Sequence, residues 1–517
     1  MTAASALAAP LVFTENGPVR GVDTPSMREF LGIPYAAAPV GDLRWRPPAA
    51  HAPWFTPLDA TKFANHCPQP ATPFGIASTT EDCLFLNVYT PRRHSDGDHD
   101  FDRDDHRLPV MVWIHGGALV TGESDDYDPT RHVEQGVVVV TINYRLGALG
   151  FLAHPAFAAE TTDPDRDRDH ESAAGNYGLM DQQFALLWVK RNIAAFGGDA
   201  DNVTIFGESA GGLSVFSQLA SPAAKGLFHK AIVESGAYSL TIPSLATAEA
   251  QGTAFATSVG CTDQTAACLR ALSVPAILAK ENAAGYVPNI DGEFLPQSLG
   301  AAFAAGQFNR VPIIQGSNHD EWRLFVALDF DLLGHPITAQ TYQAAIASLV
   351  GPVAAPIVAA QYPLADFPSP DIAFGAVGTD LIFACPARSA DQSLAKFVPV
   401  FAYEFNDENA PEDFLPPVTF PYGAAHASEL QYLFNLRVTV PRPALTASQE
   451  QLSDAMVRYW TDFAKRGDPN AFGVPFWHSY NATTEIFQSL DPPSPQGENN
   501  FATAHHCAFW TALLSGT

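Results

Sequence analysis

A serine between two glycines is the residue in this sequence best placed to act as a nucleophile. Ser209 stands in residues 207–211, GESAG, after a strand-like run at 202–206 and before a helix-like run at 212–219. Glycines at a strand-to-helix corner avoid Cβ clashes and let the serine hydroxyl project from the sheet. Such a hydroxyl can attack a carbonyl carbon once a base removes its proton. The pattern predicts a nucleophile elbow, but it is weak evidence unless the chain also supplies the partner groups.

Donors for the oxyanion of such an attack are predicted in a glycine-rich turn. Residues 110–114 form a buried-looking strand, and the turn 115–118, with sequence HGGA, follows it. Small residues let backbone N–H groups approach a carbonyl oxygen, so Gly117 and Ala118 are candidate donors. Ala210, directly after the serine, is the third candidate. The alternative is that the turn only reverses the chain, but its place after a buried strand favours the donor role.

A carboxylate to orient the base is predicted after another buried strand. Residues 311–315 are apolar and strand-like, and the sequence GSNHDE follows them and ends at Glu321. A carboxylate just beyond such a strand can reach the carboxyl edge of a parallel sheet, where open α/β sheets bind ligands. Glu321 is the predicted acid. Asp320 is its competitor, because spacing alone does not separate the two.

The base has to be chosen among sixteen histidines. His426 follows the small-residue loop 422–425 and precedes apolar residues at helical spacing. The loop comes after a strand-like run at 398–405, which places His426 at the same predicted edge of the sheet. The chain order of nucleophile, acid and histidine is the one found with nucleophile elbows. Position and order both favour His426.

These groups need a frame of buried strands to hold them. Near-continuous apolar runs, typical of strands buried on both faces, recur along the chain. They lie at 108–114, 137–143, 203–206, 231–234, 311–315 and 398–405. Helical patterns separate them, among them 179–196 and 448–465. The alternation predicts an α/β fold with a mostly parallel central sheet and helices on both faces.

Two segments differ from this alternation. Residues 245–308 and 337–383 are rich in Ala and Pro and carry short helical patterns without strong strands. We interpret them as insertions that build a lid or gorge wall on the carboxyl side of the strands. No linker divides the chain, so residues 1–517 are predicted to form a single domain.

The composition is that of a soluble globular protein of 517 residues, 47% of them hydrophobic. A net charge of −27 argues against nucleic acid and anionic membranes, which bind basic patches. No uncharged apolar run is long enough for a membrane span, so we expect none. Residues 1–10 lack the features of a signal peptide. The acidic runs 94–107 and 163–171 lack the pattern of a calcium loop and are predicted to be solvated loops.

Six cysteines are placed as three plausible pairs. Cys67 and Cys83 enclose a Pro-rich loop, Cys261 and Cys268 bracket a short polar turn, and Cys385 and Cys507 remain for each other. This placement predicts an oxidising compartment, so that the protein is secreted or periplasmic. The alternative is six reduced thiols in the core.

Ordered motifs give the sequence a resemblance to a known family. They are FLGIPYA at 30–36, EDCLFLNV at 81–88, WIHGGA at 113–118, NYRLG at 143–147, GNYGLMDQ at 175–182, GGD at 197–199, the elbow at 207–211 and CAFW at 507–510. With these motifs the chain resembles the type-B carboxylesterases, the cholinesterase-like branch of the α/β-hydrolases. The resemblance implies an α/β-hydrolase fold and a serine carboxylesterase that hydrolyses carboxylic esters through an acyl-enzyme intermediate.

The resemblance also implies the roles of particular residues. They are a catalytic triad of Ser209, Glu321 and His426, an oxyanion hole of Gly117, Ala118 and Ala210, and disulfides Cys67–Cys83, Cys261–Cys268 and Cys385–Cys507. The expected partner is a small-molecule ester, with no cofactor and no metal. The oligomeric state, monomer or dimer, stays open.

Two departures bear on the substrate. The loop between Cys67 and Cys83 has no tryptophan, whereas cholinesterases hold choline there by cation–π attraction, so choline specificity is not expected. After Glu321 the family usually has glycine, but here Trp322 and Arg323 follow. An Arg323 that faces the gorge would pair with a carboxylate on the substrate, and a solvent-facing arginine is the alternative. The candidate substrate-binding residues are Trp322, Arg323 and Phe325.

Two other functions are compatible with these residues. One is an esterase specialised for acid-bearing esters, aromatic or polycarboxylate, through Arg323. The other is a non-catalytic adhesion or binding module, since a fold alone does not prove catalysis. The presence of Ser209, Glu321 and His426 argues against the second.

Overall fold

The computed structural model describes residues 9–92, 107–157, 174–281, 286–437 and 443–515. The acidic run 163–171 and all but the last residue of the run 94–107 lie outside these ranges. Their predicted character as solvated loops therefore stays a prediction.

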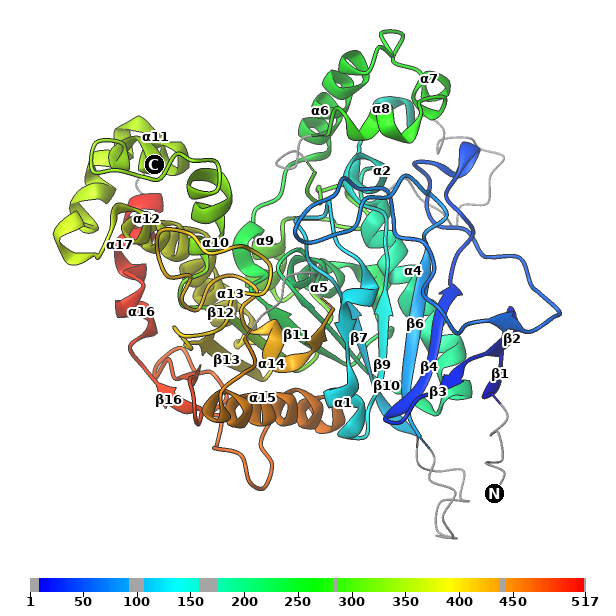
Figure 1. The fold of residues 1–517 in the computed structure, drawn as a ribbon. Coiled ribbons are helices and arrows are strands. Elements are labelled where there is room, and N and C mark those ends of the chain that lie inside the picture. Colours follow the sequence, from blue (N-terminus) through cyan, green and yellow to red (C-terminus); the bar gives the residue numbers. More distant parts are fainter. Residues whose placement is uncertain (1–8, 93–106, 158–173, 282–285, 438–442, 516–517) are drawn as a thin grey trace.

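A large mixed sheet forms the centre of the described chain (Figure 1). Its strands, from one edge to the other, are β16 (Gln496–Glu498), β15 (Phe487–Leu490), β13 (Val400–Phe405), β12 (Ile313–Asn318), β11 (Lys230–Glu234), β10 (Gly198–Glu208), β7 (Leu108–Ile114), β9 (Val138–Ile142), β6 (Phe85–Pro91), β4 (Met27–Pro34) and β3 (Val22–Asp23). Every neighbouring pair from β15 to β9 is parallel. The pairs outside them are antiparallel. The prediction of a mostly parallel sheet is confirmed.

The strands lie at the predicted apolar runs, and their ends differ from the prediction by one to three residues at β9, β11, β12 and β13. β7 has the predicted bounds, whereas β10 extends the predicted run 203–206 in both directions. In β10, Gly198 pairs with Leu108, and after an irregularity in register the pairing resumes at Val203. Its end at Glu208 brings the strand directly to Ser209.

Side chains of the central strands alternate between two hydrophobic cores. In β7, Val110, Val112 and Ile114 belong to one core, and Met111 and Trp113 belong to the other. The first core also contains the apolar faces of α4 (Tyr177–Asn192) and α5 (Ala210–Ala220), and the second contains that of α15 (Ala447–Arg466). The sheet is thus covered by helices on both faces, as predicted from strands that are apolar throughout.

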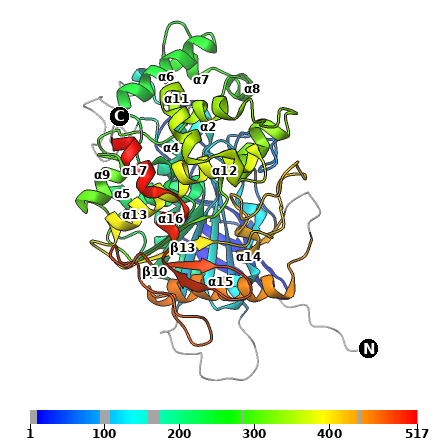
Figure 2. The ribbon, with the colours of Figure 1, turned by 90° about the vertical axis from the view of Figure 1, so that its left-hand side faces the viewer.

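The two segments interpreted as insertions are helical. The first contains α6 (Leu245–Ser258), α7 (Ala266–Arg270), α8 (Val274–Leu278) and α9 (Leu299–Ala305), and the second contains α11 (Tyr342–Gln361) and α12 (Pro370–Gly378). Figure 1 shows α6–α8 and α11–α12 as two groups in the upper half of the view, opposite α15 at the lower edge, and Figure 2 shows them after a quarter turn. The α11–α12 group has a core of its own, which also includes Trp510 of α17 (Cys507–Ser515).

Smaller elements complete the described chain. They are β1 (Leu11–Thr14), β2 (Gly17–Arg20), β5 (Leu58–Asp59), β8 (Tyr127–Asp128), β14 (Asn435–Leu436), α1 (Thr130–Glu134), α2 (Gly147–Phe151), α10 (Trp322–Val326), α13 (Cys385–Leu394), α14 (Leu430–Leu433) and α16 (Phe501–Ala504). The three disulfides implied by the resemblance are present: Cys67–Cys83, Cys261–Cys268 and Cys385–Cys507. The alternative of reduced core thiols is wrong.

Among the described helices, α11 is the one long and apolar enough in composition to cross a membrane. Its backbone is not one continuous helix, because Gly351 has φ 78° and ψ 162° in its middle. Each half is about 15 Å long at 1.5 Å per residue, half of the thickness of a bilayer core. Tyr342, Ala345, Ile346, Ala355 and Val358 of α11 are buried inside the protein. Its composition is therefore weak evidence for a membrane span.

Candidate active site

Ser209 lies at a sharp corner between β10 and α5. Its backbone has φ 56° and ψ −120°, a conformation that costs a non-glycine residue about 1–3 kcal/mol. The corner is held from β11, because the Ser209 N–H donates to the Glu234 carbonyl at 2.9 Å. This strained strand-to-helix corner has the backbone geometry of a nucleophile elbow.

Close approach of the backbone explains the two glycines of the elbow. A Cβ on Gly211 would lie 1.9 Å from the carbonyl oxygen of Ile114, and a Cβ on Gly207 would lie 2.6 Å from the same oxygen. Both separations are far inside van der Waals contact. The glycine-rich turn is equally near, since a Cβ on Gly116 would lie 3.2 Å from the Cβ of Ser209. The elbow and the turn are packed directly against each other.

The predicted oxyanion donors lie at this contact. Gly117 and Ala118 have φ values of 95° and 53°, and the Gly117 carbonyl accepts the N–H groups of Val120 and Thr121 at 3.0 Å. Within the described ranges, the N–H groups of Gly117, Ala118 and Ala210 donate to no acceptor in the protein. Unpaired N–H groups beside a hydroxyl are the arrangement that stabilises a developing oxyanion.

Glu321 and His426 form a buried pair at the carboxyl edge of the sheet. Nδ1 of His426 lies 2.5 Å from Oε2 of Glu321, and the other oxygen, Oε1, accepts the N–H of Asn318 at 2.8 Å. His426 is 6% exposed and Glu321 is fully buried. Nε2 of His426 lies 3.2 Å from Oε1 of Glu208, without hydrogen-bond geometry, so it has no hydrogen-bond partner in the described protein. One ring nitrogen of the imidazole is held by Glu321, and the other is directed at the elbow.

Asp320, the competitor for this position, has a different partner. Its Oδ1 lies 2.8 Å from Nη2 of Arg323, and its Oδ2 accepts the N–H of Ala424 at 3.0 Å. Asp320 therefore holds the loop that carries His426, and Glu321 is the carboxylate that contacts the imidazole. The sequence alone did not separate them, because the direction of a side chain beyond a strand end depends on the local turn.

Three buried glutamates at the site were missed by sequence reasoning. Glu208 is part of the elbow, Glu234 ends β11, and Glu429 follows His426 in the turn before α14. Glu429 accepts from Nδ2 of Asn318 at 2.5 Å, and Glu234 accepts from Nε1 of Trp460 at 2.9 Å. Glu208 and Glu429 could have been identified from the sequence, because they lie within three residues of Ser209 and His426.

Burial and mutual repulsion change the acidity of these groups. Burial raises the pKa of Glu208 to about 8 and that of Glu429 to about 7. Burial by itself would lower the pKa of His426, but the carboxylates of Glu208 and Glu321 outweigh it and raise the pKa to about 9. The site thus favours a positively charged imidazolium, the form that arises when His426 accepts a proton.

Two aromatic rings lie against the imidazole of His426. The ring centroids of Phe383 and Phe325 lie 5.0 Å and 5.2 Å from that of His426. Trp322 stacks on Phe325 at 4.6 Å, and Tyr238 lies 5.7 Å from Phe383. Phe325 is therefore beside the imidazole and Trp322 is behind Phe325. Phe383 was not identified as a site residue, because it is distant in sequence from the motifs.

Arg323 is turned toward Asp320. Besides this ion pair, its Nη1 donates to the carbonyl of Pro421 at 3.3 Å. The guanidinium side chain is 14% exposed. Of the predicted substrate-binding residues, Phe325 is the one whose ring lies against His426, and Arg323 has a partner within the protein.

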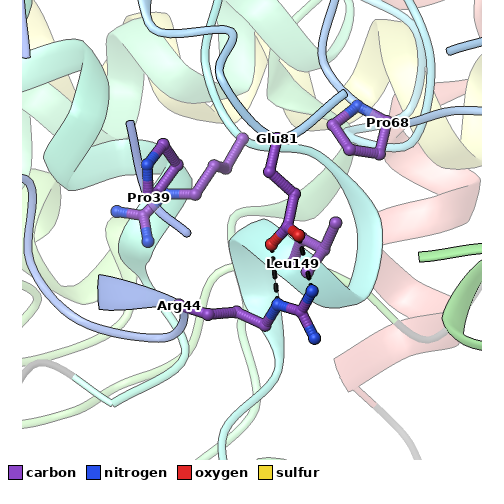
Figure 3. Close-up of a pocket in the computed structure, with 6 residues that line it drawn as sticks. Pro39, Arg44, Pro68, Glu81 and Leu149 are labelled. Carbon is purple, nitrogen blue, oxygen red and sulfur yellow. Dashed lines mark hydrogen bonds and ion pairs between the residues drawn. The ribbon is translucent and has the colours of Figure 1, made fainter. Parts of the chain in front are cut away.

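A small pocket on another part of the molecule is lined by Pro39, Arg44, Pro68, Glu81, Arg145 and Leu149 (Figure 3). Arg44 faces Glu81 across it, with Nε donating to Oε1 at 2.6 Å. Arg145 forms a second buried pair with Asp181, Nη2 to Oδ1 at 2.7 Å. None of the residues of the proposed triad lines this pocket, and each of its charged groups has an ion-pair partner in the protein.

Known proteins are similar to this chain over nearly its whole length. A family model described as the carboxylesterase family matches residues 8–510. The chain is 36% identical to an acylcarnitine hydrolase of Mus musculus, which covers 98% of this chain and 91% of the relative. It is 36% identical to a para-nitrobenzyl esterase of Bacillus subtilis (strain 168), over 93% of this chain and 94% of the relative. It is 33% identical to a cocaine esterase of Homo sapiens, over 98% of this chain and 92% of the relative.

Solved structures agree with the sequence relatives. A PNB esterase structure superposes with a TM-score of 0.77 at 34% identity, over 95% of this chain and 98% of that chain. The similarity extends over the sheet, the elbow and both helical segments because it covers almost the complete chain. The chain belongs to the carboxylesterase family, and it is a carboxylic ester hydrolase with the α/β-hydrolase fold.

Proposed function

We propose that Ser209 is the nucleophile, His426 the general base and Glu321 the acid that orients His426. The observation that carries this proposal is the buried Glu321–His426 pair, at 2.5 Å, whose free Nε2 is directed at the residue before Ser209. A base fixed on one nitrogen and open on the other is the arrangement that activates a serine hydroxyl.

In the proposed reaction, Nε2 of His426 takes the proton of the Ser209 hydroxyl as the oxygen attacks the ester carbonyl carbon. The carbonyl oxygen becomes an oxyanion and accepts hydrogen bonds from the N–H groups of Gly117, Ala118 and Ala210. Collapse breaks the bond to the alcohol oxygen, which receives the proton from His426. Water, deprotonated by His426, then attacks the acyl-enzyme, and the carboxylic acid leaves as Ser209 regains its proton.

The substrates that fit the proposed site best are uncharged esters with an apolar or aromatic group. Phe325 and Phe383 lie against the imidazole, so a group bound next to His426 meets aromatic carbon. An acid-bearing ester needs a cation, and the Arg323 guanidinium is paired with Asp320. That ion pair counts against the alternative of an esterase specialised for acidic substrates.

The relatives support the reaction more strongly than any one substrate. Their names give acylcarnitine, pyrethroid, para-nitrobenzyl ester and cocaine as substrates of those proteins, so one family handles esters of very different shape. We propose that the segments 245–308 and 337–383 wall the approach to Ser209 and set this choice. The disulfides fit an extracellular or other oxidising compartment, and we propose that the protein is secreted or periplasmic.

Replacing Ser209 with alanine tests the proposed nucleophile. We expect kcat on p-nitrophenyl esters to fall by about 10⁶-fold, because loss of a nucleophilic serine removes the covalent route. A fluorophosphonate label should attach to the parent protein and not to the Ser209→Ala variant. An adduct on the variant, or turnover that survives the change, would rule out this assignment, and the absence of any adduct on the parent would favour a non-catalytic binding module.

Arg323→Ala tests the substrate class with the same panel of esters. If Arg323 serves only Asp320 and the loop behind it, the ratio of kcat/KM for neutral and carboxylate-bearing esters stays the same in the variant. A selective loss of activity on the carboxylate-bearing esters would instead support the acid-bearing alternative.

A further inference from the structure

Two histidines and a glutamate from distant parts of the chain meet behind the proposed active site. His319 directly follows β12, Glu404 belongs to β13, and His505 lies between α16 and α17. Figure 2 shows α16 and α17 beside the end of the sheet that contains β13. The proposed ester hydrolysis uses none of these three side chains. Their potential ligand atoms all lie within 4.8 Å of one another.

Both histidines contact the same oxygen of Glu404. Nδ1 of His319 lies 2.8 Å from Oε1, and Nε2 of His505 lies 2.6 Å from Oε1. The two imidazole rings are 5.3 Å apart and meet edge to face. Two imidazole nitrogens from different segments thus converge on one carboxylate oxygen of a third.

The surrounding groups fix the orientation of His505. Its other nitrogen, Nδ1, lies 2.6 Å from Oδ1 of Asp380, and Asp380 in turn accepts from the Tyr362 hydroxyl at 2.6 Å. A carboxylate on the distal nitrogen of a histidine is the support that metal-ligating histidines have, because it fixes the tautomer and raises the basicity of the ligand. The Cys385–Cys507 disulfide lies two residues after His505 and ties this segment to α13.

The cluster is buried on one side and open on the other. The side chains of His505 and Glu404 are 3% and 8% exposed, whereas that of His319 is 35% exposed. An ion therefore has a path from solvent past His319, and a water molecule can complete its coordination on that side. Three protein ligands and one position open to water are compatible with a four-coordinate zinc ion.

We propose that His319, Glu404 and His505 bind a divalent transition-metal ion, with zinc as the best fit. Two imidazoles, which give up their protons when a metal binds, and a carboxylate are borderline ligands that suit zinc, whereas calcium and magnesium prefer sites made of oxygen alone. Tetrahedral ligands at about 2.0–2.2 Å from the ion lie about 3.3 Å from one another. To reach that geometry the nitrogen-to-oxygen separations have to open by roughly half an ångström, and the two nitrogens, within 4.8 Å of each other, have to close by up to about 1.5 Å. Rotation of the partly exposed His319 ring and of the Glu404 carboxylate is the movement that the site requires.

The bound ion has a structural role. It joins the ends of β12 and β13 to the C-terminal helices, and β12 leads through His319 to Glu321 two residues later. His319 contacts Glu404, whereas Glu321 contacts His426, so the ion takes no part in the ester reaction. An ion that binds the folded chain and not the unfolded one raises the midpoint of thermal unfolding as its concentration rises.

The test is metal binding to the complete, chelator-treated chain. We expect zinc to bind at one ion per chain in calorimetry and elemental analysis, to raise the unfolding midpoint, and to bind at least about tenfold more weakly to the His319→Gln variant. His335→Gln is the matched control, because His335 is exposed and its side chain is remote from the cluster, and it should bind zinc as the parent does. Cobalt(II) in place of zinc should give the visible absorption of a four-coordinate site in the parent and the control.

Several results would overturn the proposal. The first is a parent chain that binds no zinc at micromolar concentrations. The second is equal zinc binding by the parent and His319→Gln, because any bound ion would then lie elsewhere on this acidic protein. His319→Glu provides a second check, because it puts a carboxylate oxygen ligand in place of the imidazole nitrogen and should retain part of the zinc binding. If His319→Gln binds weakly because it misfolds, its circular dichroism differs from that of the parent. The decision then rests on His319→Glu. A well-folded His319→Glu chain that binds no zinc and gives no cobalt spectrum decides against the site.

Discussion

At the scale of single residues, the charge around His426 decides how the proposed base works. Glu321 contacts one nitrogen of the imidazole and Glu208 lies near the other, at 3.2 Å. Two carboxylates beside one buried histidine stabilise its protonated form, so the proton taken from Ser209 is held where the leaving alcohol can receive it. The same charges set the pH at which the base is free to act.

The pH dependence of kcat/KM tests the contribution of Glu208. His426 has to be neutral to act as the base, so kcat/KM rises with pH through its pKa, which the carboxylates raise to about 9. Glu208 is an anion above its own pKa of about 8, in the range where His426 loses its proton. Glu208→Gln removes that anion, and we expect the rise in kcat/KM to move to lower pH. Glu134→Gln, an exposed surface change, is the control and should leave the profile as it is. A rise that stays in place or moves to higher pH in Glu208→Gln would show that Glu208 does not act on His426.

At the scale of elements, the contact between β7, β10 and α5 places the proposed nucleophile beside the proposed oxyanion donors. The contact exists because the elbow glycines let the carbonyl of Ile114 lie where side chains would otherwise stand. The same glycines therefore serve the sheet and the active site together. A change at one of them affects both the packing and the position of Ser209.

Gly211→Ala tests this arrangement. Its Cβ would lie 1.9 Å from the carbonyl oxygen of Ile114, and backbone on both sides cannot move aside cheaply, so we expect a loss of at least about 2–3 kcal/mol of stability with a matching loss of activity. Thermal unfolding and kcat measure the two effects. Gly300→Ala in α9 is the matched control, because its Cβ would meet nothing nearer than 3.6 Å, and alanine favours helix there by up to about 1 kcal/mol. Equal behaviour of the two variants would contradict the packing argument.

At the scale of the whole molecule, the net charge of −27 creates a field that every substrate crosses. A negative field attracts cations and repels anions over distances of about a Debye length, roughly 10 Å at 0.1 M salt. This agrees with the pairing of Arg323 inside the protein, since neither feature favours acidic esters.

Ionic strength provides the measurement for this field. We expect kcat/KM for a cationic ester to fall as salt is raised from about 10 mM to 0.5 M, because screening removes the attraction. A neutral ester of the same shape should change little, which separates screening from a general effect of salt on the enzyme. A cationic ester with no salt dependence would mean that the charge of the chain does not act at the site.

Much of the fold and of the proposed site could be predicted from the sequence, because interactions between residues close in the chain determine them. Strands buried on both faces are apolar throughout, so their positions and the mostly parallel sheet were predictable. The elbow and the glycine-rich turn were predictable too, because the close approach of backbone at a corner requires glycine at particular positions. Even the order of Ser209, Glu321 and His426 is a property of the chain.

The tertiary structure decided which side chains meet. It brought Glu321 and not Asp320 to His426, turned Arg323 toward Asp320, placed Phe383 and Glu208 beside the imidazole, and gathered His319, Glu404 and His505. The physical reason is that a step of one residue beyond a strand end points the next side chain in another direction. Contacts between distant segments depend on such directions, and a sequence gives the spacing of its residues but not the direction of each side chain in space.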